Sequence, residues 1–287
     1  MPQLKPDHWA IQMFNNDRRA PERLIAHYVM ERAFANRLVT ASQADRAEVY
    51  GQVYSELFRS LPDHPQKTRA RTRETTSMMQ SLCLLKQYLT PEASFLEIGC
   101  GDAALAFEAA ERVGVAFALD VTDELIDFRR APKNFRFLRT AGRDIPLASE
   151  SIDVAYSNQL MEHLHPDDAK DQLREIVRVL KPGALYRCIT PSRVTGPHDI
   201  SCYFDDSATG LHLQEYDSVA MKEIFRSAGF RQVKFCVSVK DTQIFMPHWL
   251  LRSMELLLLA MPPDARGKFA RVNTVRLVAG LDVIGIK

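Results

Sequence analysis

The chain has 287 residues, of which 46% are hydrophobic and 25% charged, and its formal net charge is +1. This composition is typical of a globular protein, and the near-zero charge excludes a strong overall field that would recruit nucleic acid or an anionic membrane. The five cysteines are widely spaced and form no Cys-x-x-Cys pair, which indicates neither a disulfide framework nor a zinc site. With no signal peptide and no apolar run of membrane-spanning length, we expect a cytoplasmic protein.

Residues 1–75 lack strand-like alternation and are predicted to be helices separated by prolines. Apolar side chains recur at helical spacing between Ala44 and Leu57, which places Tyr50 and Tyr54 one turn apart. A basic run from Lys67 to Arg73 follows, and we expect it to be a solvated helix face. We predict that residues 1–75 form a helical lid that closes over a ligand, with the two tyrosines on its inner side.

From residue 93 the pattern changes to alternating strands and helices. Strands are predicted at 94–98, 115–119, 135–138, 152–156, 184–189, 233–239 and 278–286. Helices are predicted at 77–89, 103–113, 123–128, 166–180, 217–228 and 249–261, the last of them buried. This alternation implies an α/β fold with a doubly wound, Rossmann-like parallel sheet of seven strands. Ligands of such sheets bind at the carboxyl ends of the strands.

A glycine-rich loop, Gly99-x-Gly101, follows the first predicted strand and opens a helix, as in loops that bind a nucleotide-containing cofactor. Asp120 ends the second strand, where a ribose-binding acid is expected. Glu97 and Asp102 flank the loop; their carboxylates would repel a dinucleotide pyrophosphate and attract the ammonium and sulfonium of S-adenosylmethionine. The loop therefore favours S-adenosylmethionine. An NAD(P)-dependent oxidoreductase and a non-catalytic S-adenosylmethionine-binding protein remain alternatives.

Several segments together resemble the class I S-adenosylmethionine-dependent methyltransferases. The segments that carry the resemblance, in the family's order and spacing, are residues 95–101, 118–120, 142–147, 151–164 and 179–184. Residues 190–201 and 210–216 also look like those of a largely uncharacterised bacterial branch. The resemblance implies a methyltransferase domain over residues 76–287, with a cofactor-binding core at 93–240, preceded by the helical lid.

The resemblance also implies roles for individual residues. The cofactor contacts that we expect are Glu97, Gly99, Gly101, Asp120, Asp144, Ile145 and Asn158. Asp120 would accept hydrogen bonds from both ribose hydroxyls and Asp144 from the adenine amino group, with Ile145 against the adenine ring. Asn158 would face the reactive end of the cofactor, and the glycine loop would approach its methionine part.

Two histidines are the candidate catalytic residues. His163 lies five positions beyond Asn158, and His198 lies in the loop after the fifth strand; either could remove a proton from the methyl acceptor. His212 and Glu215 could line the acceptor pocket, and no metal site is expected. The residues after Asn158 lack the Pro-Pro-aromatic pattern of enzymes that methylate nucleic-acid bases, so no nucleic-acid substrate is expected. The predicted function is methyl transfer to oxygen or nitrogen, rather than carbon, of a small-molecule or carrier-bound acceptor.

Overall fold

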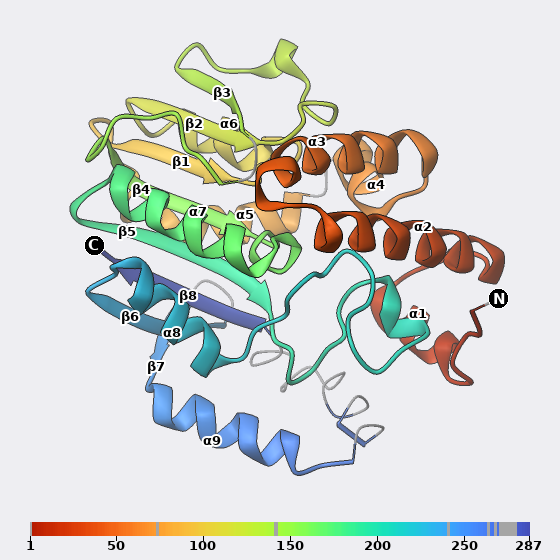
Figure 1. The fold of residues 1–287 in the computed structure, drawn as a ribbon. Helices are drawn as coiled ribbons and strands as arrows, with labels where there is room; N and C mark the ends of the chain where they lie inside the picture. The colour runs from red at the N-terminus through yellow and green to blue at the C-terminus, as the bar shows by residue number, and fades with distance from the viewer. Residues whose placement is uncertain are drawn as a thin grey trace.

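The computed structural model describes the chain apart from residues 1, 73–74, 141–142, 240–241, 263–264, 267–268 and 270–279, and apart from the side chains of 69–77 and 238–242. Its centre is one β-sheet with helices on both faces, and N-terminal helices stand beside the carboxyl ends of the central strands (Figure 1). The prediction of a Rossmann-like α/β fold is confirmed.

The sheet contains eight strands within the described residues, in the order β3-β2-β1-β4-β5-β8-β6-β7. The strands are β1 (Ser94–Ile98), β2 (Val115–Asp120), β3 (Phe135–Arg139), β4 (Ile152–Asn158), β5 (Leu180–Pro191), β6 (Gln232–Val239), β7 (Thr242–Met246) and β8 (Gly280–Ile286). Strands β1 to β5 are parallel, whereas β8 is antiparallel to β5 and β6. The expectation of a wholly parallel sheet is therefore wrong for its last strands.

The predicted count of seven strands misses β7, which pairs antiparallel with β6. Ile244 and Phe245 are adjacent in β7 and both are about half exposed. A strand with two consecutive exposed apolar residues lacks the alternation by which half-buried strands are found in a sequence. This physical reason explains why only the other seven strands were predicted.

Helices form the N-terminal extension and most of the connections between the strands. They are α1 (His8–Asn15), α2 (Pro21–Thr40), α3 (Gln43–Ser60), α4 (Pro65–Thr72), α5 (Thr75–Leu85), α6 (Ala104–Ala110), α7 (Pro166–Val179), α8 (Ser218–Ala228) and α9 (His248–Leu259), with short 3₁₀ turns η1 (Phe128–Arg130), η2 (Met161–His163) and η3 (Ile200–Tyr203). The helix expected at 123–128 is replaced by η1. Helix α6 ends at Ala110, before the predicted Val113.

End signals in the sequence are confirmed for α7 and α8. Pro166 occupies the first turn of α7, and Asp167 and Asp168 stand there with it, where carboxylates favour the helix dipole. Asp217 caps α8 by accepting a hydrogen bond from the Ala220 N–H at 2.9 Å, and Gly229 ends it in the left-handed conformation with φ +112°.

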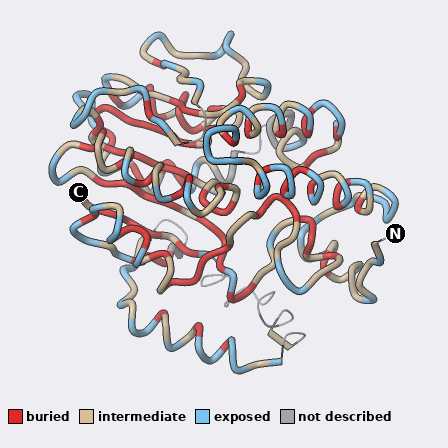
Figure 2. Tube along the Cα trace, viewed as in Figure 1, coloured by how far each residue is buried: buried red, intermediate tan, exposed pale blue. Residues whose placement is uncertain are grey.

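Each face of the sheet is covered by its own apolar core, and the central strands are buried along most of their length (Figure 2). Helices α7 and α8 cover one face, where the rings of Tyr186, Phe225 and Phe230 stack with centroids 5.0 to 6.0 Å apart. Helices α5 and α6 cover the other face. The sheet is thereby held rigidly between two helical layers, and its strand ends form a fixed platform for a site.

The N-terminal helices share the larger of the two cores. Leu38 of α2 and Val53 and Leu57 of α3 are fully buried in the cluster that also contains Ile98 and Leu119, at the ends of β1 and β2. Helix α3 therefore lies directly over the carboxyl ends of the central strands. In the basic run, the side chains of residues 69–73 lie outside the described residues.

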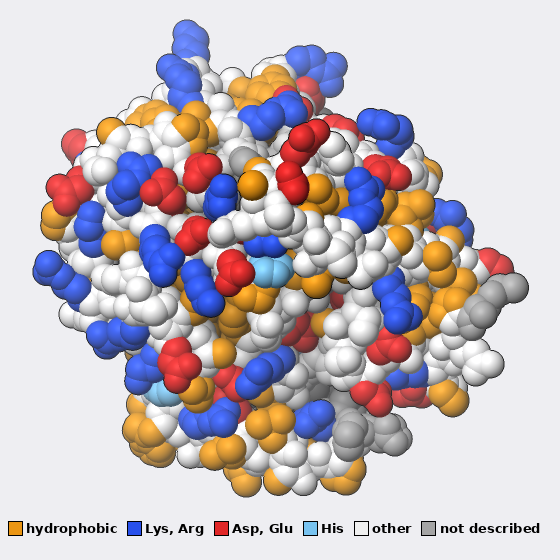
Figure 3. Space-filling view, viewed as in Figure 1, with side chains coloured by type: hydrophobic (Ala, Val, Ile, Leu, Met, Phe, Trp, Pro, Cys, Tyr) orange, Lys and Arg blue, Asp and Glu red, His pale blue; other side chains and the backbone are white. Residues whose placement is uncertain are grey.

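Helix α9 is only partly buried, which corrects the expectation of a buried helix. Leu251, Glu255 and Leu258 face inward, while Trp249 is 70% and Leu257 is 71% exposed. Apolar side chains accordingly gather along the lower edge of the space-filling view, over α9 (Figure 3). No helix in the described part of the chain is both long and apolar enough to cross a membrane.

Candidate active site

The glycine loop leaves β1 through two left-handed residues. Gly99 has φ +69° and Gly101 has φ +55°, a region that side chains with a Cβ rarely adopt. A Cβ on Gly99 would lie 2.9 Å from Cδ1 of Leu160, so only glycine fits between β1 and the loop after β4. A Cβ on Gly101 would meet no atom within 4 Å, because this residue faces open space. The loop thus exposes bare backbone to a cavity.

Asp120 stands at the end of β2 opposite this loop. Its Oδ2 accepts a hydrogen bond from the Gly101 N–H at 2.9 Å, and its Oδ1 accepts one from the Val121 N–H at 2.7 Å. Burial raises the pKa of Asp120, and these backbone donors counteract part of that rise. The remaining lone pairs of the carboxylate can accept hydrogen bonds from two ligand hydroxyls.

Two carboxylates occupy the N-terminus of α6. Glu97 accepts a hydrogen bond from the Ala106 N–H at 2.9 Å, and Asp102 accepts one from the Ala104 N–H at 3.2 Å. Burial, and next the charge of Asp102, hold the pKa of Glu97 well above its usual range. The position where a dinucleotide would place its pyrophosphate is therefore filled by side chains of the protein. Glu97 binds the helix and is not part of the cavity wall.

The cavity lies between the strand ends and α3. Its empty space, open solvent at its mouth included, is about 710 Å³. Tyr50, Tyr54 and Phe58 of α3 form one wall. The opposite wall is formed by residues of four loops that follow strands, including Gly99, Gly101, Asp120, Val121, Thr122, Leu125, Thr140, Gln159, Leu160 and His163.

The other expected cofactor contacts lie outside this wall. Asp144 is exposed, Ile145 is 2% exposed, and Asn158 is half-buried. After β4 the wall is formed instead by Gln159, in the left-handed conformation with φ +56°, and by Leu160. Sequence reasoning did not single out Gln159, which directly follows the observed end of β4 and stands three positions beyond the predicted strand 152–156.

Of the two candidate catalytic histidines, His163 reaches the cavity. It ends η2, its Nδ1 lies 3.0 Å from the Leu211 carbonyl oxygen, and its ring meets that of Tyr54 edge to face at 6.1 Å. The Leu211 carbonyl assigns the ring proton to Nδ1 and leaves a lone pair on Nε2. Burial lowers the pKa of His163 to about 3, so the imidazole is neutral near pH 7.

His198 is held in a different place. Its Nε2 lies 3.1 Å from the Ser192 carbonyl oxygen and 3.0 Å from Oγ1 of Thr195, and its backbone N–H donates to Oε1 of Glu215 at 2.8 Å. The ring is engaged by its own loop and does not line the cavity. The structure thus separates His198 from the glycine loop, whereas His163 shares a cavity with it.

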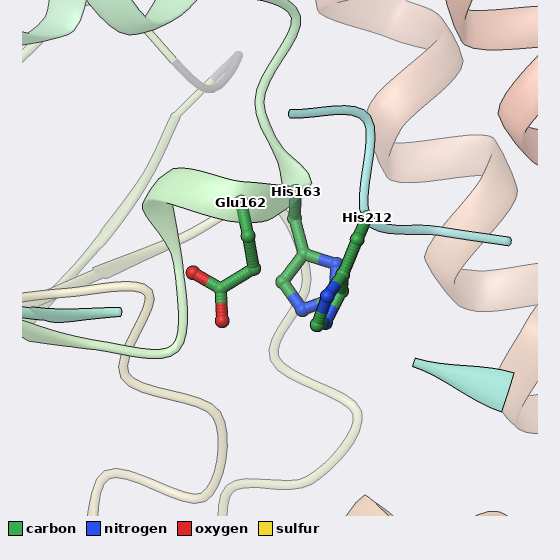
Figure 4. Close-up of side chains that lie close together, drawn as sticks. All are labelled: Glu162, His163 and His212. Atoms are coloured by element: carbon green, nitrogen blue, oxygen red, sulfur yellow. The ribbon is translucent and has the colours of Figure 1, made fainter. Parts of the chain in front are cut away.

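Two residues expected near the acceptor, His212 and Glu215, are both buried. His212 meets the ring of His163 edge to face, with centroids 4.9 Å apart, and its Nδ1 lies 2.8 Å from Oε1 of Glu215. Glu162 lies beside the two rings, and one potential ligand atom from each of Glu162, His163 and His212 lies within 4.8 Å of the others (Figure 4). This cluster forms one end of the site.

The electrostatics of the cluster differ from residue to residue. Burial raises the pKa of Glu162 to about 7. Burial alone would lower the pKa of His212, but its hydrogen bond to Glu215 and the charges of Glu162 and Asp199 raise it to about 9. The hydrogen bond from His212 also helps to hold the pKa of Glu215 below its usual value, against the effect of burial.

These features together define a Rossmann-like domain that binds an adenosine-containing cofactor. Residues 96–188 match the sequence profile of the family described as "Methyltransferase domain". This part of the chain is therefore a methyltransferase domain of the class I, S-adenosylmethionine-dependent kind, and S-adenosylmethionine is the cofactor of this domain. The cavity fits that cofactor: the Asp120 carboxylate keeps lone pairs that ligand hydroxyls can use, and Gly101 leaves room that a Cβ would fill.

Curated relatives agree with this assignment over part of their length. A probable S-adenosylmethionine-dependent methyltransferase of Mycolicibacterium smegmatis is 32% identical over 143 residues, which are 47% of this chain and 51% of that protein. A demethylmenaquinone methyltransferase of Lactococcus lactis is 28% identical over 171 residues, 50% of this chain and 67% of that protein. The chain thus spans about half the length of the first relative and two thirds of the second.

A solved structure shows the same fold. Phosphoethanolamine N-methyltransferase 2 of Haemonchus contortus, in complex with phosphomonomethylethanolamine and S-adenosylhomocysteine, matches with a TM-score of 0.54 at 16% identity. The match covers 80% of this chain and 60% of that chain. At this identity the likeness concerns the fold alone.

Proposed function

We propose that this chain transfers a methyl group from S-adenosylmethionine to oxygen or nitrogen of a small-molecule or carrier-bound acceptor. The observation that carries the proposal is the single cavity shared by the glycine loop, Asp120 and His163. The bound cofactor supplies a methyl group activated by its sulfonium. The protein then needs chiefly to align the acceptor with that methyl group and to exclude water.

The residues divide this work by their position. The Gly99–Gly101 backbone holds the methionine part, and Asp120 accepts from the ribose hydroxyls, while Asp144 and Ile145 receive the adenine. Asn158 and its neighbour Gln159 stand at the end of β4, beside His163, so this side of the cavity takes the acceptor. His163 is neutral and its Nε2 is free to contact the acceptor or a group bound to it.

Helix α3 is the part of the proposed lid that lies against the cavity. Tyr50 and Tyr54 of α3 line the cavity from the N-terminal side. We propose that residues 1–75 close the cavity when the cofactor is bound, and that Tyr54, in contact with His163, keeps water from the reacting groups.

Two relatives are named for small acceptors, which supports the acceptor class. One is the demethylmenaquinone methyltransferase, and the other is phosphoethanolamine N-methyltransferase 1 of Triticum aestivum, 26% identical over 40% of this chain. These names place small molecules among the acceptors of related domains. They support a small acceptor for this chain as well.

Calorimetry and a turnover assay test the proposal. We expect S-adenosylhomocysteine to bind with one site per chain and NAD to give no heat, because Glu97 and Asp102 occupy the N-terminus of α6. Metabolite fractions added with S-adenosylmethionine should then yield S-adenosylhomocysteine in at least one fraction. Binding of NAD alone would assign the chain to the oxidoreductases. If the cofactor binds but no fraction yields S-adenosylhomocysteine, the chain would be assigned to the non-catalytic binding proteins.

A further inference from the structure

The cluster of Glu162, His163 and His212 is built from two separate segments. Glu162 and His163 belong to η2 after β4, whereas His212 lies in the loop before α8 (Figure 4). The Gln214 N–H donates a hydrogen bond to the Glu162 carbonyl oxygen at 3.1 Å, which holds the two segments together. The relative position of the three side chains is thereby fixed by backbone as well as by packing.

One carboxylate oxygen in this cluster has an unmet hydrogen-bonding capacity. Glu162 is fully buried, and its Oε2 accepts a hydrogen bond from Oγ1 of Thr190 at 2.9 Å. Its Oε1 is also buried, and no partner for it exists among the described residues. A buried oxygen without a partner is costly, and in native proteins it usually marks an ion, a water molecule or a functional role.

The hydrogen bonds of His163 and His212 orient their rings in the way that is typical of metal-binding histidines. Nδ1 of His163 is engaged by the Leu211 carbonyl and Nδ1 of His212 by the Glu215 carboxylate, at 3.0 and 2.8 Å. Ligating histidines almost always donate their second ring N–H to a carbonyl or carboxylate in this way, which aims the other nitrogen at the metal. Each ring therefore offers Nε2 to the space beside Glu162.

From this arrangement we propose that Glu162, His163 and His212 bind a divalent transition-metal cation, with Zn²⁺ as the ion best suited to two imidazoles and one carboxylate. The candidate ligand atoms lie within 4.8 Å of one another. Four-coordinate zinc with bonds of about 2.1 Å separates its ligands by about 3.4 Å, so the side chains need to move by only about 1 Å. The carboxylates of Glu162 and Glu215 balance the charge of a dication.

Three protein ligands leave a coordination position for a further ligand, as in catalytic zinc sites. His163 lines the cofactor cavity, and His212 lines a second, open groove beside α2, so the cluster lies where the two spaces approach each other. We place the open position toward the acceptor side of the cavity, where an oxygen of the acceptor can bind the metal. This last step rests on the proposed methyl transfer and favours an oxygen acceptor over nitrogen; the metal site itself does not depend on it.

Cobalt titration of the chelator-treated full chain tests the metal site without cofactor or acceptor. We expect one equivalent of Co²⁺ to give visible absorption bands of a four- or five-coordinate ion, and Zn²⁺ to displace it. Glu162→Gln and His212→Asn should each weaken Co²⁺ binding by at least about 100-fold, and Glu215→Gln by about 10- to 100-fold. The control His165→Asn changes a histidine two positions from His163 and outside the cluster, and should bind Co²⁺ like the wild type.

Two further measurements separate the possible failures. S-adenosylhomocysteine binding by each variant shows whether the fold and the cofactor site are intact, so loss of the metal is distinguished from loss of the proposed function. X-ray absorption of the zinc-loaded wild type, which needs no variant, should show two imidazoles and oxygen at about 2.0–2.2 Å. Acetohydroxamate, a small oxygen ligand, should shift the Co²⁺ spectrum if the open position exists.

Contrary results have definite meanings. Absence of stoichiometric Co²⁺ and Zn²⁺ binding would overturn the metal site and leave the cluster as a hydrogen-bonded group. Equal binding by the wild type, Glu162→Gln and His212→Asn would place the ion elsewhere and also overturn it. A Co²⁺ spectrum that acetohydroxamate leaves unchanged would overturn the open position only.

Discussion

Tyr50 and Asp168 lie 118 positions apart in the sequence, yet the Tyr50 hydroxyl donates a hydrogen bond to the Asp168 carboxylate over 3.2 Å. The same hydroxyl accepts a hydrogen bond from the His165 N–H at 2.8 Å. Arg46 adds two hydrogen bonds to Asp168, at 2.7 and 3.2 Å. A wall of the cofactor cavity is therefore tied to the beginning of α7, the helix that follows the proposed acceptor side.

The buried Arg46–Asp168 pair predicts a large effect on stability. Arg46→Ala leaves the buried Asp168 carboxylate without its charged partner, and we expect the free energy of unfolding to fall by about 3 kcal/mol. Arg37→Ala is the matched control, because it removes an exposed ion pair with Glu56 and should cost at most about 1 kcal/mol. Urea denaturation of both variants gives the comparison. If both variants lose the same free energy of unfolding, the buried Arg46–Asp168 pair does not stabilise the packing of α3.

We predict that Gly101→Ala weakens cofactor binding, and that backbone strain alone does not account for the loss. In Gly101→Ala the new methyl group projects into the cavity and occupies space that the cofactor needs, at a residue with φ +55°. Gly183→Ala is the control: it has φ +80° and equally open surroundings, but it lies in β5 outside the cavity wall. Both variants should lose about 1–2 kcal/mol of stability, since a Cβ disfavours this conformation.

Calorimetry with S-adenosylhomocysteine then separates the two glycine variants. We expect Gly101→Ala to bind at least about tenfold more weakly than the wild type, the equivalent of about 1.4 kcal/mol, while Gly183→Ala binds normally. Wild-type affinity in Gly101→Ala would mean that the cofactor does not approach this loop.

We predict that a substitution of Asp120 weakens binding of S-adenosylhomocysteine, because this carboxylate is proposed to bind the ribose. Asp120→Asn keeps an oxygen for the Gly101 N–H but loses the charge and one acceptor, so S-adenosylhomocysteine binding should weaken by about 2 kcal/mol, roughly 30-fold. Asp123→Asn removes a carboxylate three positions away that pairs with Arg139 and does not line the cavity. Isothermal titration of both variants should show the loss in Asp120→Asn alone; a similar loss in both would indicate a general effect of charge.

The sequence predicts β1 and β4 well because these strands are buried along most of their length, and a glycine and an acidic residue mark the ends of β1 and β2. Gly99 and Asp120 follow directly from that pattern and reach the cavity wall. The exposed apolar residues of β7 broke the pattern, and that strand was missed. The resemblance places Asp144 and Asn158 at the cofactor, which stays a prediction, and Gln159 is a residue of the cavity wall that the sequence did not single out.

The cluster around His163 could not be predicted from the sequence. His163 and Leu211, whose carbonyl fixes its tautomer, are 48 positions apart. Their proximity depends on how the long segment between β5 and α8 folds back over η2, and no local periodicity encodes that path. The expectation of no metal site considered residues close together in the sequence, and the proposed metal site differs in that it joins residues of two distant segments.

The lid proposal predicts a change in hydrogen exchange in α3. Without ligand, the cavity side of α3 faces empty space, and Tyr54 is only partly buried. When S-adenosylhomocysteine fills the cavity, the helix gains packing on that side, so local opening becomes rarer and amide exchange across residues 45–60 should slow by at least about fivefold. Mass spectrometry of deuterated peptides, with and without saturating ligand, measures this. Helix α8, which does not line the cavity, is the internal control, because ligand should leave its amide exchange unchanged. If α3 exchanges equally with and without ligand in the wild type, its packing against Leu119 and Ile98 already holds it closed, and residues 1–75 are a fixed flank of the domain rather than a lid.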